Sequence, residues 1–562
     1  MAPSRIALVL SAALAAPLAA QAPPQQPAAL ILTAARIHTA DAARPLVQAI
    51  AIRSDRIVFA GSVREALVLR GPATRVLDLP GLTVVPGITD AHVHLAGLGT
   101  ALRTVDLTGT RSYDEVIQRV VARAARARPG EWIRGRGWNQ MDWPDTRFPT
   151  HEALSRAVPN NPVVLTRVDG HASLVNARAL EAARLTAATR DPDGGRILRN
   201  PDGSPSGVFV DAAQGLVRRV MPPSSRDEQR EEILVAIAEA NRWGLTGIHD
   251  AGVGPGTIDL YEELARAGRY NLRNYVMIDD DSATLRRYFA RGPQRALYDG
   301  RIWLRAIKGV ADGALGSRGA ALLEDYSDEP GNRGLITTPI EYIRSVAVQA
   351  LRNGFQLNVH AIGDRANREA LDAFEWALGQ VPTADHRFRI EHAQVIHRQD
   401  IPRFAQLGVI PSMQGSHQSS DAPMAMNRVG WTRAQGAYAW RSLLATGVVI
   451  PNGTDFPVER VNPFIGFHAF VTRQDPTNWP AGGWFPAERL TREEALLAMT
   501  LWPAYASFTE DVQGSITPGK YADFVVLSQD IMSIAPERIL DAEVLMTVLG
   551  GRVVYQKEGW QP

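Results

Sequence analysis

The stretch that decides the fold is residues 86–94, Pro-Gly-Ile-Thr-Asp-Ala-His-Val-His, in which a strand-like run ends in two histidines one residue apart. Side chains two positions apart in a β-strand point to the same side, so the imidazoles of His92 and His94 are expected to face the same way. Polar side chains at the carboxyl end of a strand are typical of the site-bearing face of a parallel barrel. The stretch therefore predicts a first barrel strand over Ile88–His94 that delivers two candidate metal ligands.

Seven further strand-like runs follow this first one, and segments with helical periodicity, such as residues 341–353 and 367–378, lie between them. The runs cover residues 245–250, 274–278, 304–310, 356–360, 387–392, 409–413 and 448–455. Eight strands that alternate with helices predict an α/β protein built on a (β/α)8 TIM-type barrel. The gap between the first two strands is too long for one helix, so we expect an inserted subdomain at about residues 100–235.

The two ends of the chain share another texture, with short apolar runs separated by glycines. Such runs, at residues 30–86, 523–527 and 544–554, are typical of antiparallel strands. Neither end is large enough to form a good core alone, so we expect one composite β-sandwich. The predicted domains are thus a sandwich over 23–86 and 513–562 around a barrel over 87–512.

The first residues read as a signal peptide over residues 1–22. Arg5 precedes an apolar run at residues 6–14, and small residues follow it. This run is shorter than the roughly 20 residues of a membrane-spanning helix. The sequence therefore predicts a periplasmic or secreted protein that has no membrane attachment once the signal is removed.

The overall charge and the absence of cysteine limit which ligands and which metal sites the protein can have. The 562-residue chain has 60 Lys plus Arg and 59 Asp plus Glu, a formal net charge of +1. Such a balance gives no sign of a nucleic-acid partner and favours a small-molecule substrate, while a homodimer is compatible with it. The chain has no cysteine, which excludes disulfides and cysteine-bound zinc.

Three more candidate ligands follow later strands. His360 ends the fifth predicted strand, His392 the sixth and Asp455 the eighth. The carboxyl ends of barrel strands meet at one mouth, and imidazole and carboxylate are ligands that zinc prefers. A single histidine at a strand end is more often an ordinary hydrogen-bonded residue, but five such side chains together predict a metal centre. Five ligands are many for one zinc and favour two divalent ions.

Two ions a few ångströms apart need a bridging anion, and Lys308 in the fourth predicted strand is a candidate. A desolvated, neutral lysine can take up CO₂ as a carbamate, which would bridge the ions. The alternative is a buried, unmodified lysine paired with Asp312 or another carboxylate.

At this point several motifs resemble a known family. The stretch at 86–94 resembles the entry signature of the amidohydrolase superfamily. The stretches 308–320, 359–366, 389–394, 412–421 and 514–524 are similar to its YtcJ-like branch (amidohydrolase family 3), which includes N-substituted formamide deformylases. The resemblance covers nearly the whole mature chain.

The resemblance implies a ligand arrangement and an activity. By analogy, His92, His94 and Asp455 would hold the more buried ion, His360 and His392 the second ion, and N6-carboxylated Lys308 would bridge two divalent ions, zinc in the first instance. The implied activity is hydrolysis of a C–N amide-type bond, N-acyl or N-formyl, by a metal-activated water.

Three residues are predicted to take part in the chemistry. Asp455 would accept a proton from the attacking water and pass it to the leaving group. His171, from the insertion, or His417, after the seventh strand, would donate a hydrogen bond to the oxyanion, although each also has a purely structural interpretation. Trp138 and Trp143 would line the pocket or, in the interpretation we favour, form the core of the subdomain.

Other functions use the same scaffold. A mononuclear deaminase would leave Lys308 unmodified, and counting the metal ions separates it from the dinuclear hydrolase. An ester or lactone hydrolase would use the same machinery. A non-catalytic binding protein would have little reason to keep all five ligands.

Overall fold

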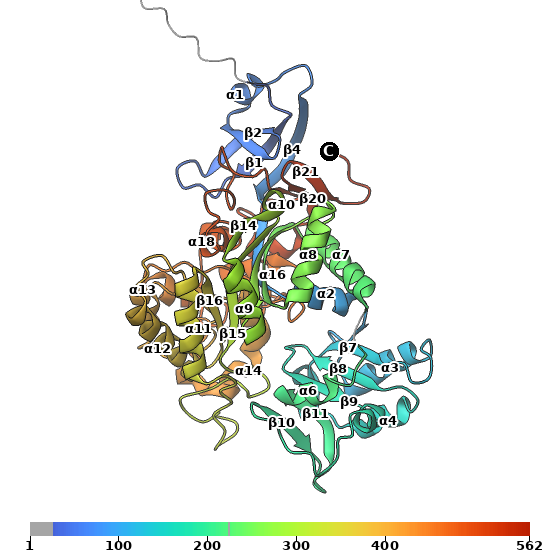
Figure 1. Cartoon of the computed structure of the whole chain (residues 1–562). Coiled ribbons are helices and arrows are strands. Elements are labelled where there is room, and N and C mark those ends of the chain that lie inside the picture. The colour runs from blue at the N-terminus through green and yellow to red at the C-terminus, as the bar shows by residue number, and fades with distance from the viewer. Residues whose placement is uncertain (1–25, 223–224) are drawn as a thin grey trace, which may run out of the picture.

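The computed structural model describes residues 26–222 and 225–562, so the predicted signal peptide over residues 1–22 lies outside the described residues. Figure 1 shows three parts: a sheet that holds strands from both termini, a central body of parallel strands and helices, and a separate lobe formed by residues between β5 and α7. The central body carries most of the buried apolar side chains.

Seven parallel strands form a nearly closed barrel, as the alternation in the sequence predicts. Their order around the barrel is the order in the chain: β5 (Ile88–Val93), β12 (Leu245–Val253), β13 (Arg273–Asp279), β15 (Ile302–Val310), β16 (Gln356–Ala361), β17 (Arg389–His392) and β18 (Ile410–Ser412). A short strand, β14 (Gln294–Ala296), pairs antiparallel with β15 outside this path. Because all seven run the same way, their carboxyl ends meet at one mouth.

The eighth strand, expected over residues 448–455, is not a regular strand, and the prediction was wrong on this point. The segment instead makes a few backbone hydrogen bonds to each of its neighbours without forming a regular ladder. Met413 N donates to Pro451 O at 3.0 Å on the β18 side, and Ala91 N donates to Asn452 O at 2.9 Å on the β5 side. The chain therefore closes the barrel with an irregular segment, and Asp455 at its end has a left-handed φ of 60°.

Helices follow the strands and cover the outside of the barrel (Figure 1). They are α2 (Leu95–Leu102), α7 (Arg226–Arg242), α8 (Pro255–Arg266), α9 (Ser282–Arg291), α10 (Leu297–Gly300), α11 (Ile340–Asn353), α12 (Asp364–Gln380), α13 (Ile401–Leu407), α14 (Gly415–Ala434), α15 (Trp440–Leu444), α16 (Pro463–Thr472), α17 (Arg492–Ala498) and α18 (Leu501–Ala506). Helices α2 and α7 pack so closely that a Cβ on Gly99 would lie 2.2 Å from Glu232 O. Glycine is therefore required at this crossing, directly beside the strand that carries His92.

Strands from both ends of the chain form one seven-stranded sheet. Its order is β21 (Arg552–Gln556), β20 (Val544–Leu549), β19 (Phe524–Leu527), β4 (Arg75–Pro86), β1 (Leu30–His38), β2 (Leu46–Arg53) and β3 (Arg56–Gly61), with helix α1 (Val63–Leu67) beside it. β4 joins the two ends, since it pairs with β1 in parallel and with β19 antiparallel. The division of this sheet into the two layers of a sandwich stays a prediction.

The segment between β5 and β12 contains its own six-stranded sheet, in the order β10 (Gly195–Arg199), β11 (Pro205–Asp211), β9 (Ala172–Val175), β8 (Val163–Arg167), β7 (Ile133–Trp138) and β6 (Val105–Asp106). Helices α3 (Tyr113–Ala124), α4 (His151–Ala157), α5 (Ala177–Ala182) and α6 (Gly215–Arg218) belong to the same lobe. Trp138 and Trp143 are buried in its core, and their indole N–H groups donate to Leu165 O and Thr110 O. They therefore stabilise the lobe, as the favoured interpretation of the sequence holds.

Among the described residues, no helix combines the length and the apolar character needed to cross a bilayer.

Candidate metal centre

Two groups of potential ligands meet at the barrel mouth and share one carboxylate. His92, His94 and Asp455 form the first group, and His392, His417 and Asp455 the second, each with ligand atoms within 4.8 Å of one another. Asp455 Oδ1 lies 3.2 Å from His94 Nε2 and 3.7 Å from His92 Nε2. Its other oxygen, Oδ2, lies 3.6 Å from His417 Nε2. One carboxylate thus belongs to both groups, each of which could hold a metal ion.

The imidazoles are held from behind by hydrogen bonds to their Nδ1 atoms. His92 Nδ1 lies 2.5 Å from a Glu391 carboxylate oxygen, His94 Nδ1 lies 3.0 Å from Ala251 O, and His392 Nδ1 lies 2.9 Å from Gln414 Oε1. Each partner is an oxygen acceptor, so each Nδ1 carries the proton and each Nε2 keeps a free lone pair. Metal-binding histidines are oriented in this way by a second hydrogen bond.

The atoms that face the centre lack hydrogen-bond partners. Among the described residues, His92 Nε2, His360 Nε2, His417 Nε2 and Asp455 Oδ1 are buried without one. Unpaired buried polar atoms cost free energy, and a cluster of them on ligand-type side chains fits a site for cations. The residues present therefore suit divalent metal ions.

Charges and burial keep these side chains in the forms that bind metals. Burial lowers the pKa of His92 and takes those of His360 and His392 well below the usual value, so these imidazoles are neutral near pH 7. Burial alone would raise the pKa of Asp455, but its close contact with His94 and the neighbouring imidazoles hold that pKa well below its usual value. The aspartate is therefore ionised.

His360 lies beside the second ligand group, and His417 belongs to it. The His360 ring lies 4.5 Å from that of His392, but its ligand atoms belong to neither group, and its Nε2 lies 3.4 Å from Asp312 Oδ1. His417, a predicted hydrogen-bond donor to the oxyanion, is also a member of the second group. It stands in the first turn of α14, directly after the seventh barrel strand.

Lys308 is buried in β15 and faces this centre. Burial lowers the pKa of its amine, and the nearby carboxylates of Glu391 and Asp455 partly oppose this shift. Asp312, the partner expected for an unmodified lysine, instead accepts hydrogen bonds from three backbone N–H groups: those of Ala321, Ile362 and Gly363. The proximity of Lys308 to the ligands keeps the bridging role open, and its carboxylation stays a prediction.

Glu391 is a functional residue that the sequence reasoning missed. It adjoins His392 in a strand, and adjacent strand residues point to opposite faces, so strand geometry places only one of them inside the barrel. The backbone leaves the strand at this point, with φ of 74° at His392 and 45° at Ala393. Glu391 therefore reaches His92 while His392 reaches the second group.

A buried arginine supports Glu391 below the centre. Arg389 Nε lies 2.7 Å from a Glu391 oxygen, and Arg389 also donates to Ser412 Oγ at 2.7 Å and to His249 Nδ1 at 2.9 Å. Both charged side chains are fully buried. This network fixes the position of the Glu391 carboxylate and, through it, that of His92.

Replacing Glu391 with glutamine is expected to weaken metal binding by about 10–100-fold, because the acceptor of the His92 proton loses its charge. Equilibrium dialysis against zinc, with Glu369→Gln as the control in a surface pair with Arg365, would measure the change. Unchanged affinity would mean that Glu391 does not set the position of His92.

The insertion brings His171 to the same mouth. The His171 ring lies 5.6 Å from that of His360, and His171 Nδ1 lies 2.6 Å from Asp211 Oδ1. Burial would lower the pKa of His171, but the hydrogen bond to Asp211 and the charge of that residue outweigh it and raise the pKa. His171 is therefore a candidate N–H donor that faces the centre from the side opposite the barrel.

Comparison with known proteins places this arrangement in a family. The Amidohydrolase family model matches residues 75–555. Protein LONG AFTER FAR-RED 3 of Arabidopsis thaliana is 35% identical over 94% of this chain and 91% of its own length. The putative amidohydrolase YtcJ of Bacillus subtilis is 32% identical over 86% of this chain and 91% of its own length. The N-substituted formamide deformylase of Arthrobacter pascens is 29% identical over 94% of this chain and 99% of its own length.

A solved structure agrees with these sequence matches. An uncharacterized metal-dependent hydrolase from Pyrococcus furiosus superposes with a TM-score of 0.71 at 28% identity, covering 90% of this chain and all of that one. The family model spans both ligand groups and, in the terminal sheet, β4, β19 and β20, whereas β1, β2 and β3 lie before its first matched residue. The protein is thus a member of the amidohydrolase family of metal-dependent hydrolases, in the branch of YtcJ and N-substituted formamide deformylase.

Proposed function

We propose that this protein hydrolyses a C–N amide-type bond of an N-acyl or N-formyl compound at a centre of two divalent ions. The observation that carries the proposal is the carboxylate of Asp455, shared by two groups of oriented imidazoles. The similarity to an N-substituted formamide deformylase, over 94% of this chain, supports the choice of bond. Zinc is the proposed ion, because imidazole and carboxylate ligands suit it.

Bound zinc ions would supply Lewis acidity and make a water molecule acidic near neutral pH. Asp455 adjoins both groups and is ionised, so one of its oxygens can accept the proton of the attacking water and later deliver it to the leaving nitrogen. His171 faces the same space and donates its Nε2–H to the oxygen of the tetrahedral intermediate. His417 serves in this proposal as a ligand of the second group.

Lys308 is proposed to carry the anion between the two ions. Its neutral amine attacks CO₂, and loss of one proton leaves a carbamate with a single negative charge. The support is its burial beside Asp455 and Glu391, together with the lowered pKa of its amine.

The test is a metal count on the purified protein, before and after Lys308→Ala. We expect close to two zinc ions per chain in the wild type and a marked loss in the variant, because the bridging anion is gone. The sequence holds three lysines, so Lys557→Ala, at an exposed pair with Glu543, is the matched control. Growth with ¹³C-bicarbonate would reveal a carbamate by NMR that is absent from Lys308→Ala.

The same preparation is assayed with N-formyl and N-acetyl amines and with esters of the same acyl groups. Faster turnover of the amides supports the proposed bond, and faster turnover of the esters assigns the esterase alternative. One ion per chain that survives Lys308→Ala would contradict the dinuclear centre and favour the mononuclear deaminase.

A further inference from the structure

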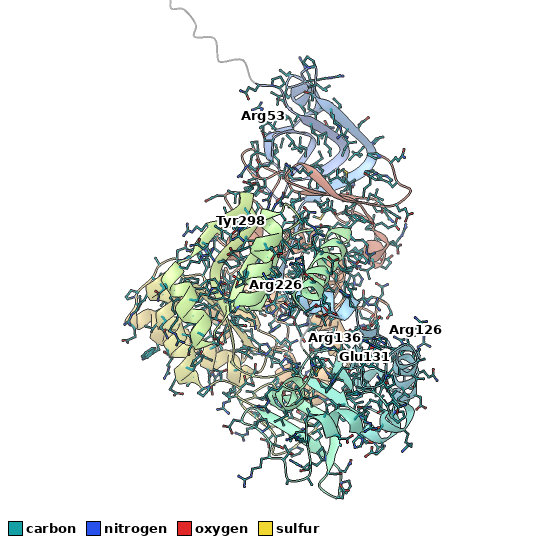
Figure 2. All side chains as sticks on the ribbon, turned by 45° about the vertical axis from the view of Figure 1, so that its right-hand side comes forward. Arg53, Arg126, Glu131, Arg136, Arg226 and Tyr298 are labelled. Carbon is teal, nitrogen blue, oxygen red and sulfur yellow. The ribbon has the colours of Figure 1, made fainter. Side chains whose placement is uncertain are left out.

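An arginine of the insertion bridges the two parts of the protein at the barrel mouth. Arg136, in β7, donates from Nε to Pro457 O at 3.2 Å and from Nη2 to Val168 O at 3.0 Å. Pro457 stands two residues after Asp455, and Val168 stands three residues before His171. Figure 2 labels Arg136 where the insertion faces the barrel. The guanidinium therefore lies between the segments that deliver two of the proposed reacting groups.

Most of the hydrogen-bonding capacity of Arg136 is unused. A guanidinium has five N–H donors, and two of them account for the contacts to carbonyl oxygens. The charge of Arg136 meets no ion-pair partner among the described residues. By contrast, Arg167, on the next strand, is satisfied by Asp169, Gln140 and Asn139.

The unused edge of Arg136 faces the loop that carries His171. A Cβ built on Gly170 would lie 3.6 Å from Nη1 and 3.7 Å from Nη2 of Arg136. Gly170 also has a φ of +77°, a conformation that other residues rarely adopt. Because residue 170 is glycine, no side chain lies against the Nη atoms at the position directly before His171.

A second cation lies close to Arg136 on the insertion. Arg218, in α6, is exposed and donates to Gln214 Oε1 at 3.0 Å. Burial lowers the pKa of Arg136, and the charge of Arg218 lowers it further, whereas the charges of Asp169 and Asp455 oppose this shift. Gln214 in turn donates to Gly170 O at 3.0 Å. Arg136 and Arg218 are thus two neighbouring cations of the insertion, with the carboxylates of Asp169 and Asp455 close to Arg136.

We propose that Arg136 binds a carboxylate of the substrate, so that the enzyme prefers N-acyl or N-formyl compounds that carry an anionic group beside the scissile bond. A guanidinium that keeps an unused N–H on each Nη atom can bind a carboxylate with two parallel hydrogen bonds. This inference rests on the proposed amide hydrolysis. The structural alternative is that Arg136 only ties the insertion to the barrel.

The experiment pairs each N-acetyl or N-formyl amino acid with its carboxamide, which has the same shape without the charge. The wild type is expected to show a kcat/KM at least about tenfold higher for the acids, and Arg136→Gln is expected to lose this preference mainly through KM. Arg136→Lys keeps the positive charge but cannot form two parallel hydrogen bonds, so it should retain part of the preference for the acids. Arg134→Gln is the matched control, since Arg134 stands two residues earlier in β7 and donates to Pro222 O.

The possible outcomes separate the two proposals. Turnover without a preference for the acids, or a preference that Arg136→Gln leaves intact, overturns the role of Arg136 while amide hydrolysis stands. If neither compound is turned over, the proposed function fails, and calorimetric titration of the zinc-loaded protein with the same acids decides the binding role. Binding about tenfold weaker in Arg136→Gln than in Arg134→Gln would then support it, and equal or undetectable binding would refute it. Thermal melts of all variants exclude a loss of fold.

Discussion

Replacing Asp455 with asparagine is expected to lower kcat by about 10⁴-fold while the protein keeps its fold. The amide has the shape of the carboxylate but cannot accept the proton of the attacking water. The backbone hydrogen bond from Asp455 N to His92 O, at 2.8 Å, does not depend on the side chain, so the closure of the barrel is retained. Steady-state kinetics on the best amide of the panel, with circular dichroism alongside, would measure both effects.

Two controls make this result specific. Asp259→Asn, in an exposed pair with Arg287, removes a carboxylate far from the centre and should keep the wild-type rate. Because Asp455 faces both ligand groups, zinc content must be measured as well, and the comparison is made at saturating zinc. A fully loaded variant that retains the wild-type rate would rule out Asp455 as the proton acceptor.

Replacing Arg389 with methionine is expected to give the largest loss of stability, about 3–5 kcal/mol, because it leaves the Glu391 carboxylate buried without its partner. The lost contacts include those to Ser412 and to Ala91 O, which connect three barrel strands. For a protein of this size we expect the midpoint of thermal unfolding to fall by an amount of the order of 5 °C at a fixed scan rate. Calorimetry of the metal-free protein measures this without a contribution from bound zinc.

A second substitution distinguishes a buried unpaired charge from simple loss of packing. Arg389→Met combined with Glu391→Gln removes both charges, so much of the lost stability should return. Arg365→Met, in an exposed pair with Glu369, should change the midpoint little, since such pairs contribute about 0–1 kcal/mol. A double variant no more stable than Arg389→Met would show that the arginine acts through packing alone.

The fold followed from the sequence wherever local periodicity and burial agree. Mainly apolar runs such as β15, which is largely buried although Arg305 and Lys308 interrupt it, indicate parallel strands. Helices of regular period such as α11 and α12 lie where the pattern placed them. The eighth strand did not follow, because residues 448–455 have strand-like composition but form only an isolated bridge to Met413 and no regular ladder. The composition of a segment does not show whether its backbone can form regular hydrogen-bond ladders with the strands on both sides.

The sequence alone predicted that His92, His94, His392 and Asp455 meet at one mouth, because each lies at the carboxyl end of a predicted strand and parallel strands bring those ends together. Only the tertiary structure decided their neighbours. Left-handed backbone at His392 turns Glu391 inward against the alternation of a strand, and the first turn of α14 inserts His417 beside Asp455. The insertion places Arg136 at the same mouth, more than 300 positions before Asp455 in the chain. These placements depend on backbone angles and on contacts between segments far apart in sequence, and neither is encoded in the local pattern of residues.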